Sequence, residues 1–393
     1  MDKNNVVIVS AARTPIGRFC GTLSNFSNID LGAIVIAEAV NRVAGILNND
    51  IDEVIMGCIM QTEPRGNPAR EALLKAELSN NTPAFTINKN CASSLKSITL
   101  GAASIMLGET DIVVAGGMES MTNAPYLLRN ARTGLRLGNS EVCDFLTETL
   151  EGMGLTAEKL AEIYSISRED QDLFAYNSQL KAAKAQKQNK FTHEIVPILI
   201  PQKRKNPILF SNDEGVRADS SLDKLAALRP AFTRDGSGSV TAGNSSTLSD
   251  GAAAMVLMSE ERAKQLNLKP LVRVVDWTST GCDPEIMGIG PVSAVKKLCR
   301  KNGLTINDFD LIELNEAFAA QSLSVIKELG IDTEKCNVNG GAIAHGHPVG
   351  ATGAILVIKL INELKRRKLH KGLITLCVGG GQGMALYIEN CQI

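Results

Sequence analysis

The chain has 393 residues, 44% of them hydrophobic, which is long enough for two or three packed units rather than one core. Lys and Arg number 41 against 42 for Asp and Glu, so the formal net charge of -1 gives no overall attraction for nucleic acid or an anionic membrane. The first residues lack the features of a secretory signal, and no run of about 18 apolar residues occurs, so we expect a cytoplasmic protein without a transmembrane helix.

Apolar, β-branched runs alternate with amphipathic segments along the chain, as expected of an α/β protein with buried sheets. Two helices are predicted in the middle, at 154–164 and 167–186, with Thr156 and Ser167 among their capping residues. From there to about Gly243 the chain has many turn signals and is interpreted as loop-rich. The predicted strands cover 6–14, 52–60, 111–117, 271–279, 310–317, 372–381 and 383–390.

One order of elements occurs twice. In the first half it is a short strand at 86–88, a turn at Cys91, an apolar helix and a strand. In the second half it is a short strand at 338–339, a glycine-rich turn, an apolar helix at 351–367 and a strand. Many α/β proteins repeat such an order, and the glycine cluster that ends each copy adds weight to a duplication. Both helices are apolar nearly all round, which predicts that they are buried between layers.

Nine cysteines are scattered along the chain without CxxC pairs or CxxH spacing, which argues against a zinc site and a disulfide framework. We therefore expect reduced thiols and no metal site. Cys91 differs from the others because it lies where an extended segment turns into a helix. The unpaired N–H groups of a helix start stabilise a thiolate, as a nucleophile requires. Structural cysteines also occupy such positions, so this feature alone does not decide the role.

His347 lies in the segment AHGHPVGATG, where glycines permit close backbone approach and Pro348 fixes the chain direction before a helix. A histidine held on such a turn beside a thiol can accept its proton. The proposed duplication places the Cys91 turn and the His347 turn at equivalent ends of paired helices. A capping or core histidine is the alternative interpretation.

Cys377 ends a predicted strand and is followed by the glycine cluster VGGGQG. Successive glycines free backbone N–H groups to face a developing negative charge, which is the requirement of an oxyanion hole. The cluster precedes a strand and lacks both the P-loop and the GxGxxG pattern, which argues against nucleotide binding. Asn315 and Glu316 mark a further strand end, where short polar side chains either enter a cleft or cap a helix.

Six motifs stand out along the chain, namely NKNCASS, GGMESM, GNSSTLSDGAA, NEAFA, GGAIAHGHPVGATG and CVGGGQG. In their order and approximate spacing they resemble the motifs of thiolases, and the resemblance covers nearly the whole chain. The fold that this resemblance implies is an α/β fold of five layers, α-β-α-β-α, built from two duplicated domains with an inserted loop domain for coenzyme A. The implied boundaries are 1–118 and 248–270 for the N-terminal domain, 119–247 for the loop domain and 271–393 for the C-terminal domain.

The resemblance also implies roles for matching residues. Cys91 occupies the position of the acylated nucleophile, His347 that of its activating base and Cys377 that of the acid/base cysteine. Asn315 matches the residue that fixes an oxyanion-hole water alongside His347, and the N–H groups of Cys91 and Gly379 match a second oxyanion hole. Ser246, Arg217, Met153 and the backbone near Ala242 match contacts to coenzyme A.

The implied activity is the reversible condensation of two acetyl-CoA molecules through an acyl-cysteine. Acyl-CoA would be substrate and product, with no tightly bound cofactor, and the chain would form a homo-oligomer, a dimer or tetramer. Gly152 stands where many short-chain enzymes have histidine, so a 3-ketoacyl-CoA thiolase for longer chains remains an alternative. A non-catalytic CoA-binding protein is a second one, and a ketoacyl synthase would pair its cysteine with two histidines. The basic run 203–205 is interpreted as a solvated hairpin tip rather than a phosphate site.

Overall fold

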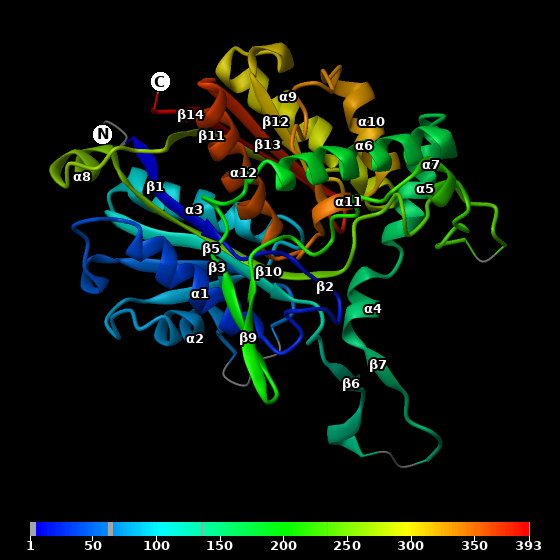
Figure 1. The fold of residues 1–393 in the computed structure, drawn as a ribbon, viewed down its shortest axis with the longest axis horizontal. Coiled ribbons are helices and arrows are strands. Elements are labelled where there is room, and N and C mark those ends of the chain that lie inside the picture. The colour runs from blue at the N-terminus through cyan, green and yellow to red at the C-terminus, as the bar shows by residue number, and fades with distance from the viewer. Residues whose placement is uncertain (1–4, 62–65, 135–136, 234, 393) are drawn as a thin grey trace.

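The computed structural model describes residues 5–61, 66–134, 137–233 and 235–392. One large sheet runs through the molecule in the order β12-β13-β14-β11-β1-β10-β5-β3-β4, with β2 paired to β10 (Figure 1). Its N-terminal half contains β1 (Val6–Arg13), β2 (Gly17–Arg18), β3 (Glu53–Gly57), β4 (Ala84–Ile87), β5 (Ile112–Ser120) and β10 (Ser249–Ser259). Its C-terminal half contains β11 (Val272–Gly281), β12 (Leu311–Leu314), β13 (Lys371–Val378) and β14 (Gln382–Asn390).

The two halves of the sheet have the same topology. From the centre outwards, β1, β10 and β5 pair antiparallel, and β3 joins β5 in parallel. In the same way β11, β14 and β13 pair antiparallel, and β12 joins β13 in parallel. The halves are joined by antiparallel pairing of β1 with β11, between Val6 and Val274 among others. This repeated order supports the predicted duplication.

Helices cover both outer faces of the sheet and fill the space between its halves. The outer face of the N-terminal half is covered by α1 (Asn28–Asn41) and α2 (Pro68–Lys75). The outer face of the C-terminal half is covered by α9 (Gly290–Asn302) and α10 (Ala319–Leu329). Between the halves lie α3 (Ser93–Leu107) and α12 (Thr352–Arg367). The resulting order of layers is α-β-α-β-α, as predicted.

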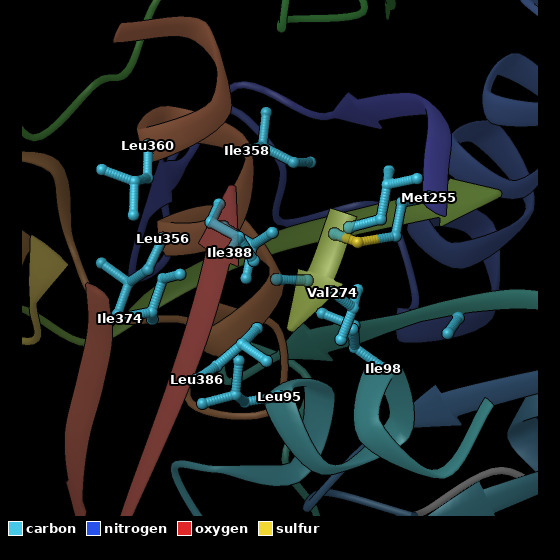
Figure 2. Close-up of a cluster of buried hydrophobic side chains, with 14 of the residues drawn as sticks. Leu95, Ile98, Met255, Val274, Leu356, Ile358, Leu360, Ile374, Leu386 and Ile388 are labelled. Carbon is cyan, nitrogen blue, oxygen red and sulfur yellow. The ribbon is translucent and has the colours of Figure 1, made fainter. Parts of the chain in front are cut away.

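The central layer is the largest apolar core of the molecule (Figure 2). Leu95 and Ile98 of α3 and Leu356 of α12 are buried in it against strands of both halves. The two helices approach closely, since a Cβ on Gly353 of α12 would lie 2.6 Å from the backbone nitrogen of Leu95. Both helices are therefore buried between layers, as their all-round apolar sequences predicted.

A long insertion between β5 and β10 supplies one side of the molecule (Figure 1). Ser167 caps α6 through a capping box with Asp170, as predicted, but the prediction for Thr156 is wrong. The preceding helix starts at Met153, after Gly152 in the left-handed conformation, so Thr156 lies inside it. The insertion contains β6 (Tyr126–Leu128), β7 (Val142–Asp144), α4 (Phe145–Leu150), α5 (Met153–Ile163), α6 (Arg168–Lys187), β8 (Ile198–Gln202), β9 (Lys205–Phe210) and α7 (Leu222–Ala226).

Two further predictions can be compared with the structure. The basic run 203–205 is exposed and lies at the turn between β8 and β9, as predicted. The short strand predicted at 338–339 does not form, and Cys336 instead makes a single parallel bridge with Ile312 of β12. The two remaining short helices are α8 (Glu260–Gln265) and, before the His347 turn, α11 (Ala342–His345). Within the part of the chain that the structure describes, no helix is both long and apolar enough to cross a membrane.

Candidate active site

A cavity of about 250 Å3 opens where the two halves and the insertion meet. Five residues singled out in the sequence line it. Two predicted coenzyme A contacts, Arg217 and Ala242, are exposed and are not among the described residues that line this cavity. The five residues that were singled out in the sequence and that line the cavity are Cys91, Met153, Ser246, His347 and Gly379.

Two apolar clusters contribute residues to the wall of the cavity. Cys91 packs against the cluster that includes Ile59, Met121 and Val349. Cys377 belongs to the other cluster, together with Phe318, and is completely buried just behind that wall. The two cysteines thus approach the same space from the two halves of the duplicated fold.

The turn that carries Cys91 is held by hydrogen bonds within the turn and by one to the other half of the molecule. Asn90 has a positive φ of 45°, and its side-chain amide donates to the carbonyl oxygen of Gly379 at 2.8 Å. The Ser93 hydroxyl accepts from the N–H of Lys89 at 2.8 Å and donates to the carbonyl of Asn90 at 2.6 Å. The Cys91 turn is therefore tied directly to the glycine cluster that follows Cys377.

The Cys91 thiol is not pre-ionised in this structure. Burial raises its pKa, and the backbone N–H groups of Gly379 and Cys91, which lower it, only partly offset this. The sequence led us to expect that the helix start would favour the thiolate, and here burial is the larger effect. Cys91 therefore needs a base to become a nucleophile.

His347 has the protonation state of such a base. Its Nδ1 lies 2.7 Å from the Thr352 hydroxyl, which itself donates to the carbonyl of Pro348 at 3.0 Å. Since that hydroxyl has given away its only hydrogen, it accepts from His347, and Nδ1 carries the proton. Nε2 is therefore the acceptor nitrogen of the ring, and it accepts a long hydrogen bond from the Asn315 side-chain nitrogen at 3.4 Å. Burial lowers the His347 pKa to about 4, so the ring is neutral at neutral pH.

Two further polar side chains, those of Cys377 and Asn315, lie close to Cys91 and His347. Burial and the nearby Cys91 raise the pKa of the Cys377 thiol, so it too is protonated. Asn315 is fully buried, and its Oδ1 has no hydrogen-bond partner among the described residues. An unpaired buried oxygen is costly, and such atoms are concentrated at places where a ligand or water binds.

The His347 turn is held by a buried network of charges. Arg13 forms ion pairs with Glu194 at 2.8 Å and Asp213 at 2.7 Å, and all three side chains are buried. Asp213 also accepts a hydrogen bond from Nδ1 of His345 at 2.9 Å. Arg13 and His345 hold the pKa of Asp213 well below its usual range. His345 precedes His347 by two residues, so this network fixes the start of the His347 turn.

Comparison with known families decides what this arrangement belongs to. The family model described as "Thiolase, N-terminal domain" matches residues 6–261, and "Thiolase, C-terminal domain" matches residues 268–390. The chain belongs to the thiolase family.

Named relatives and solved structures agree with this assignment. An acetyl-CoA acetyltransferase of Chromobacterium violaceum is 50% identical to this thiolase over 391 residues, 98% of this chain and 99% of that protein. The crystal structure of the Bacillus anthracis acetyl-CoA acetyltransferase has a TM-score of 0.96 at 48% identity, covering 99% of both chains. Human mitochondrial 3-ketoacyl-CoA thiolase in complex with CoA has a TM-score of 0.94 at 40% identity, covering 98% of both chains.

Several cavity residues of this thiolase were missed in the sequence. Phe232 lies edge-to-face on Phe318 at 5.8 Å between ring centroids. It also covers Gly154, where a Cβ would lie 2.1 Å from the ring. Phe318 is part of the NEAFA motif and could have been found from it. Phe232 lies in the segment interpreted as loop-rich, which gave no signal for a binding role. The other missed lining residues include Ile59, Asn90, Met121, Met287 and Val349.

Proposed function

We propose that this chain is an acetyl-CoA C-acetyltransferase, which condenses two acetyl-CoA molecules to acetoacetyl-CoA and CoA and catalyses the reverse thiolysis. The observation that carries the proposal is the meeting of Cys91, neutral His347 and the Gly379 backbone in one cavity, with Cys377 directly behind its wall. The names of the relatives at about 50% identity support the choice of acetyl-CoA as substrate.

In the acylation step, Nε2 of His347 takes the proton from Cys91, and the thiolate attacks the thioester carbonyl of the first acetyl-CoA. The N–H groups of Cys91 and Gly379 already act on the Cys91 sulfur and are placed to stabilise the negative oxygen of the tetrahedral intermediate. The CoA thiolate leaves and receives a proton from Cys377. The acetyl group then remains on Cys91, with Cys377 as thiolate and His347 protonated.

In the condensation step, the Cys377 thiolate removes a proton from the methyl group of a second acetyl-CoA. The carbanion attacks the acetyl thioester on Cys91, and acetoacetyl-CoA is released as the Cys91 thiolate leaves and recovers its proton from His347. The side-chain nitrogen of Asn315 and Nε2 of His347 lie 3.4 Å apart. Together they can hold a water molecule that donates a hydrogen bond to the enolate oxygen that develops in this step. All protons are balanced, and each cysteine ends as a thiol.

The coenzyme A moiety would approach through the side of the cavity formed by Met153 and Ser246. Arg217 and Ala242, exposed outside the cavity, remain proposed contacts for more distant parts of coenzyme A. Acyl-CoA would be bound only as substrate and product. A cytoplasmic location and a dimeric or tetrameric state are part of the same proposal, and sedimentation analysis tests the latter.

Trapping of the acyl-enzyme tests the mechanism. Incubation with radiolabelled acetyl-CoA should place label on the peptide that contains Cys91, and Cys91→Ala should acquire none. In Cys377→Ser, the transfer of acetyl groups between Cys91 and CoA should be largely retained, whereas the condensation of two acetyl groups should be suppressed. Failure of the wild-type chain to acquire label would instead favour a CoA-binding protein without catalysis.

Chain length is tested by kinetics. We expect a higher kcat/KM for acetoacetyl-CoA than for a 3-ketoacyl-CoA of six to ten carbons. The competing candidate is a 3-ketoacyl-CoA thiolase for longer chains, which is favoured by the likeness to the human 3-ketoacyl-CoA thiolase and by the apolar cavity wall. A preference of orders of magnitude for the longer substrate would establish that candidate.

A further inference from the structure

We propose that Glu119 is a positioning residue that joins the two halves of the cavity wall beside Cys91 and whose negative charge opposes ionisation of that thiol. The proposal rests on the proposed role of Cys91 as nucleophile. Glu119 lies near the end of β5, and none of its surface is exposed. It does not line the cavity itself, so it acts through the backbone and the thiol that surround it.

The Glu119 carboxylate binds backbone from both halves of the fold. From the N-terminal half it accepts hydrogen bonds from the N–H of Met60 at 2.9 Å and of Ile59 at 3.1 Å. From the C-terminal half it accepts one from the N–H of Gly350 at 2.8 Å. The thiol of Cys58 approaches it at 3.7 Å. These contacts link the segment after β3 to the turn that carries His347.

Each of these segments contributes a residue to the cavity wall. Ile59 lines the cavity from the first segment, and Val349, adjacent to Gly350, lines it from the second. The fit is close, because a Cβ on Gly350 would lie 2.5 Å from Glu119 Oε2. One carboxylate therefore sets the separation of two wall segments between which Cys91 packs.

The charge of Glu119 has no cationic partner. Among the described residues it takes part in no salt bridge, in contrast to the buried Asp213 and Glu194, which share Arg13. A buried carboxylate that is compensated by backbone donors and one thiol, without a cation, is expensive to ionise, and burial raises the Glu119 pKa to about 7. Its charge thus changes close to neutral pH. When ionised, Glu119 opposes ionisation of Cys91 and adds to the rise in the pKa of that thiol.

Alkylation of Cys91 as a function of pH tests the proposal without requiring catalysis. Cys91 modification by iodoacetamide is followed by peptide mass spectrometry, with the exposed Cys20 as an internal reference. Glu119→Gln should move the Cys91 profile to lower pH, because a neighbouring like charge is removed. It should also lower kcat about tenfold, since one acceptor oxygen replaces two and the His347 turn loosens. Glu119→Asp, which keeps the charge, should recover most of the wild-type alkylation profile.

Asp250→Asn is the matched control. Asp250 is buried on the neighbouring strand, opposite Ser120, and binds the N–H and hydroxyl of Thr122 and the backbone of Met121, rather than the segments of Ile59 and Gly350 that Glu119 holds. A Cys91 profile that is the same in Glu119→Gln as in the wild type, or a shift of equal size in Asp250→Asn, would overturn the proposal. If Glu119→Gln does not fold, the wild-type profile decides. It should deviate from a single titration near pH 7, and one simple titration curve would count against the proposal.

These results are independent of the proposed function. Failure of the wild type to be acetylated on Cys91 would reject the acyltransferase mechanism, while the alkylation profiles would still measure the coupling between Glu119 and the thiol.

Discussion

The turn that carries Cys91 and the turn that carries His347 occupy equivalent places in the two halves, yet they are held in different ways. The Cys91 turn is partly exposed and is held by uncharged hydrogen bonds, one from Ser93 within the turn and one from Asn90 to Gly379 of the other half. The His347 turn is entirely buried and is bound by Thr352, by Glu119 and by the charged network of Arg13. A nucleophile must accept and release an acyl group, whereas a base must keep one tautomer and one orientation. The difference matches these two tasks.

The largest effect is expected from removing the cation beneath the His347 turn. Arg13→Met leaves Asp213 and Glu194 buried without their partner, which should reduce the free energy of unfolding by about 3–5 kcal/mol, measured in urea. Lys75→Met is the control, because it removes only the exposed partner of Asp30 and should change stability by less than about 1 kcal/mol. Equal losses in the two variants would contradict the assigned importance of the network.

The two buried carboxylates that hold this turn should give stability opposite dependences on pH. Asp213 has a lowered pKa in the folded state, so its contribution is present above its unfolded pKa of about 3.9 and is lost as pH falls below that value. Glu119 has a folded pKa raised to about 7, so the folded state binds a proton more tightly than the unfolded state does. The free energy of unfolding therefore decreases as pH rises from about 4.3 to about 7. Each slope is limited to about 1.4 kcal/mol per pH unit.

Urea unfolding across this pH range separates the two contributions. Glu119→Gln should flatten the neutral part of the curve and leave the acid part unchanged. Asp213→Asn should do the reverse. The comparison fails if either variant changes the slope in both ranges.

A smaller effect is expected from the hydroxyl that sets the His347 tautomer. Thr352→Val removes the acceptor of Nδ1–H and should lower kcat about 10- to 100-fold, because an unsatisfied buried donor costs about 1–3 kcal/mol. Thr99→Val removes a buried hydroxyl from the neighbouring central helix, where it binds only the carbonyl of Lys96, and should leave kcat nearly unchanged. Steady-state kinetics of both variants provide the measurement.

The smallest effect is expected on the Cys91 turn. Asn90→Gly preserves the positive φ but removes the hydrogen bond to Gly379, which should lower kcat/KM by roughly fivefold, equivalent to about 1 kcal/mol. Asn267→Gly makes the same backbone change at an exposed site and should have no effect on activity. If Asn90→Gly were as damaging as Thr352→Val, the contrast between the two turns would be wrong.

Much of the fold followed from sequence patterns that act locally. The apolar runs predicted the strands, and Ser167 with Asp170 predicted a helix start. The prediction that Thr156 caps a helix was wrong, because the helix begins earlier, after Gly152 with its positive φ. The family motifs identified Cys91, His347 and Gly379, which the structure brings to one cavity.

The supports of the site could not be predicted in the same way. Arg13 and Asp213 are 200 residues apart, and no local pattern links them. Glu119 lies within a recognised motif, but its role depends on backbone N–H groups that only the folded chain brings together. The ionisation of Cys91 was misjudged because a helix start is visible in a sequence, whereas the degree of burial is not.

The close contact of α3 and α12 at Gly353 and Leu95 has a consequence for how the enzyme comes into being. Each helix begins at one of the two turns and packs mainly on strands of its own half, so that the other helix covers part of its remaining apolar surface. Neither half expressed alone can shield its central helix from water. Assembly of the core and appearance of the reactive centre are therefore a single event, and a partly folded chain has neither.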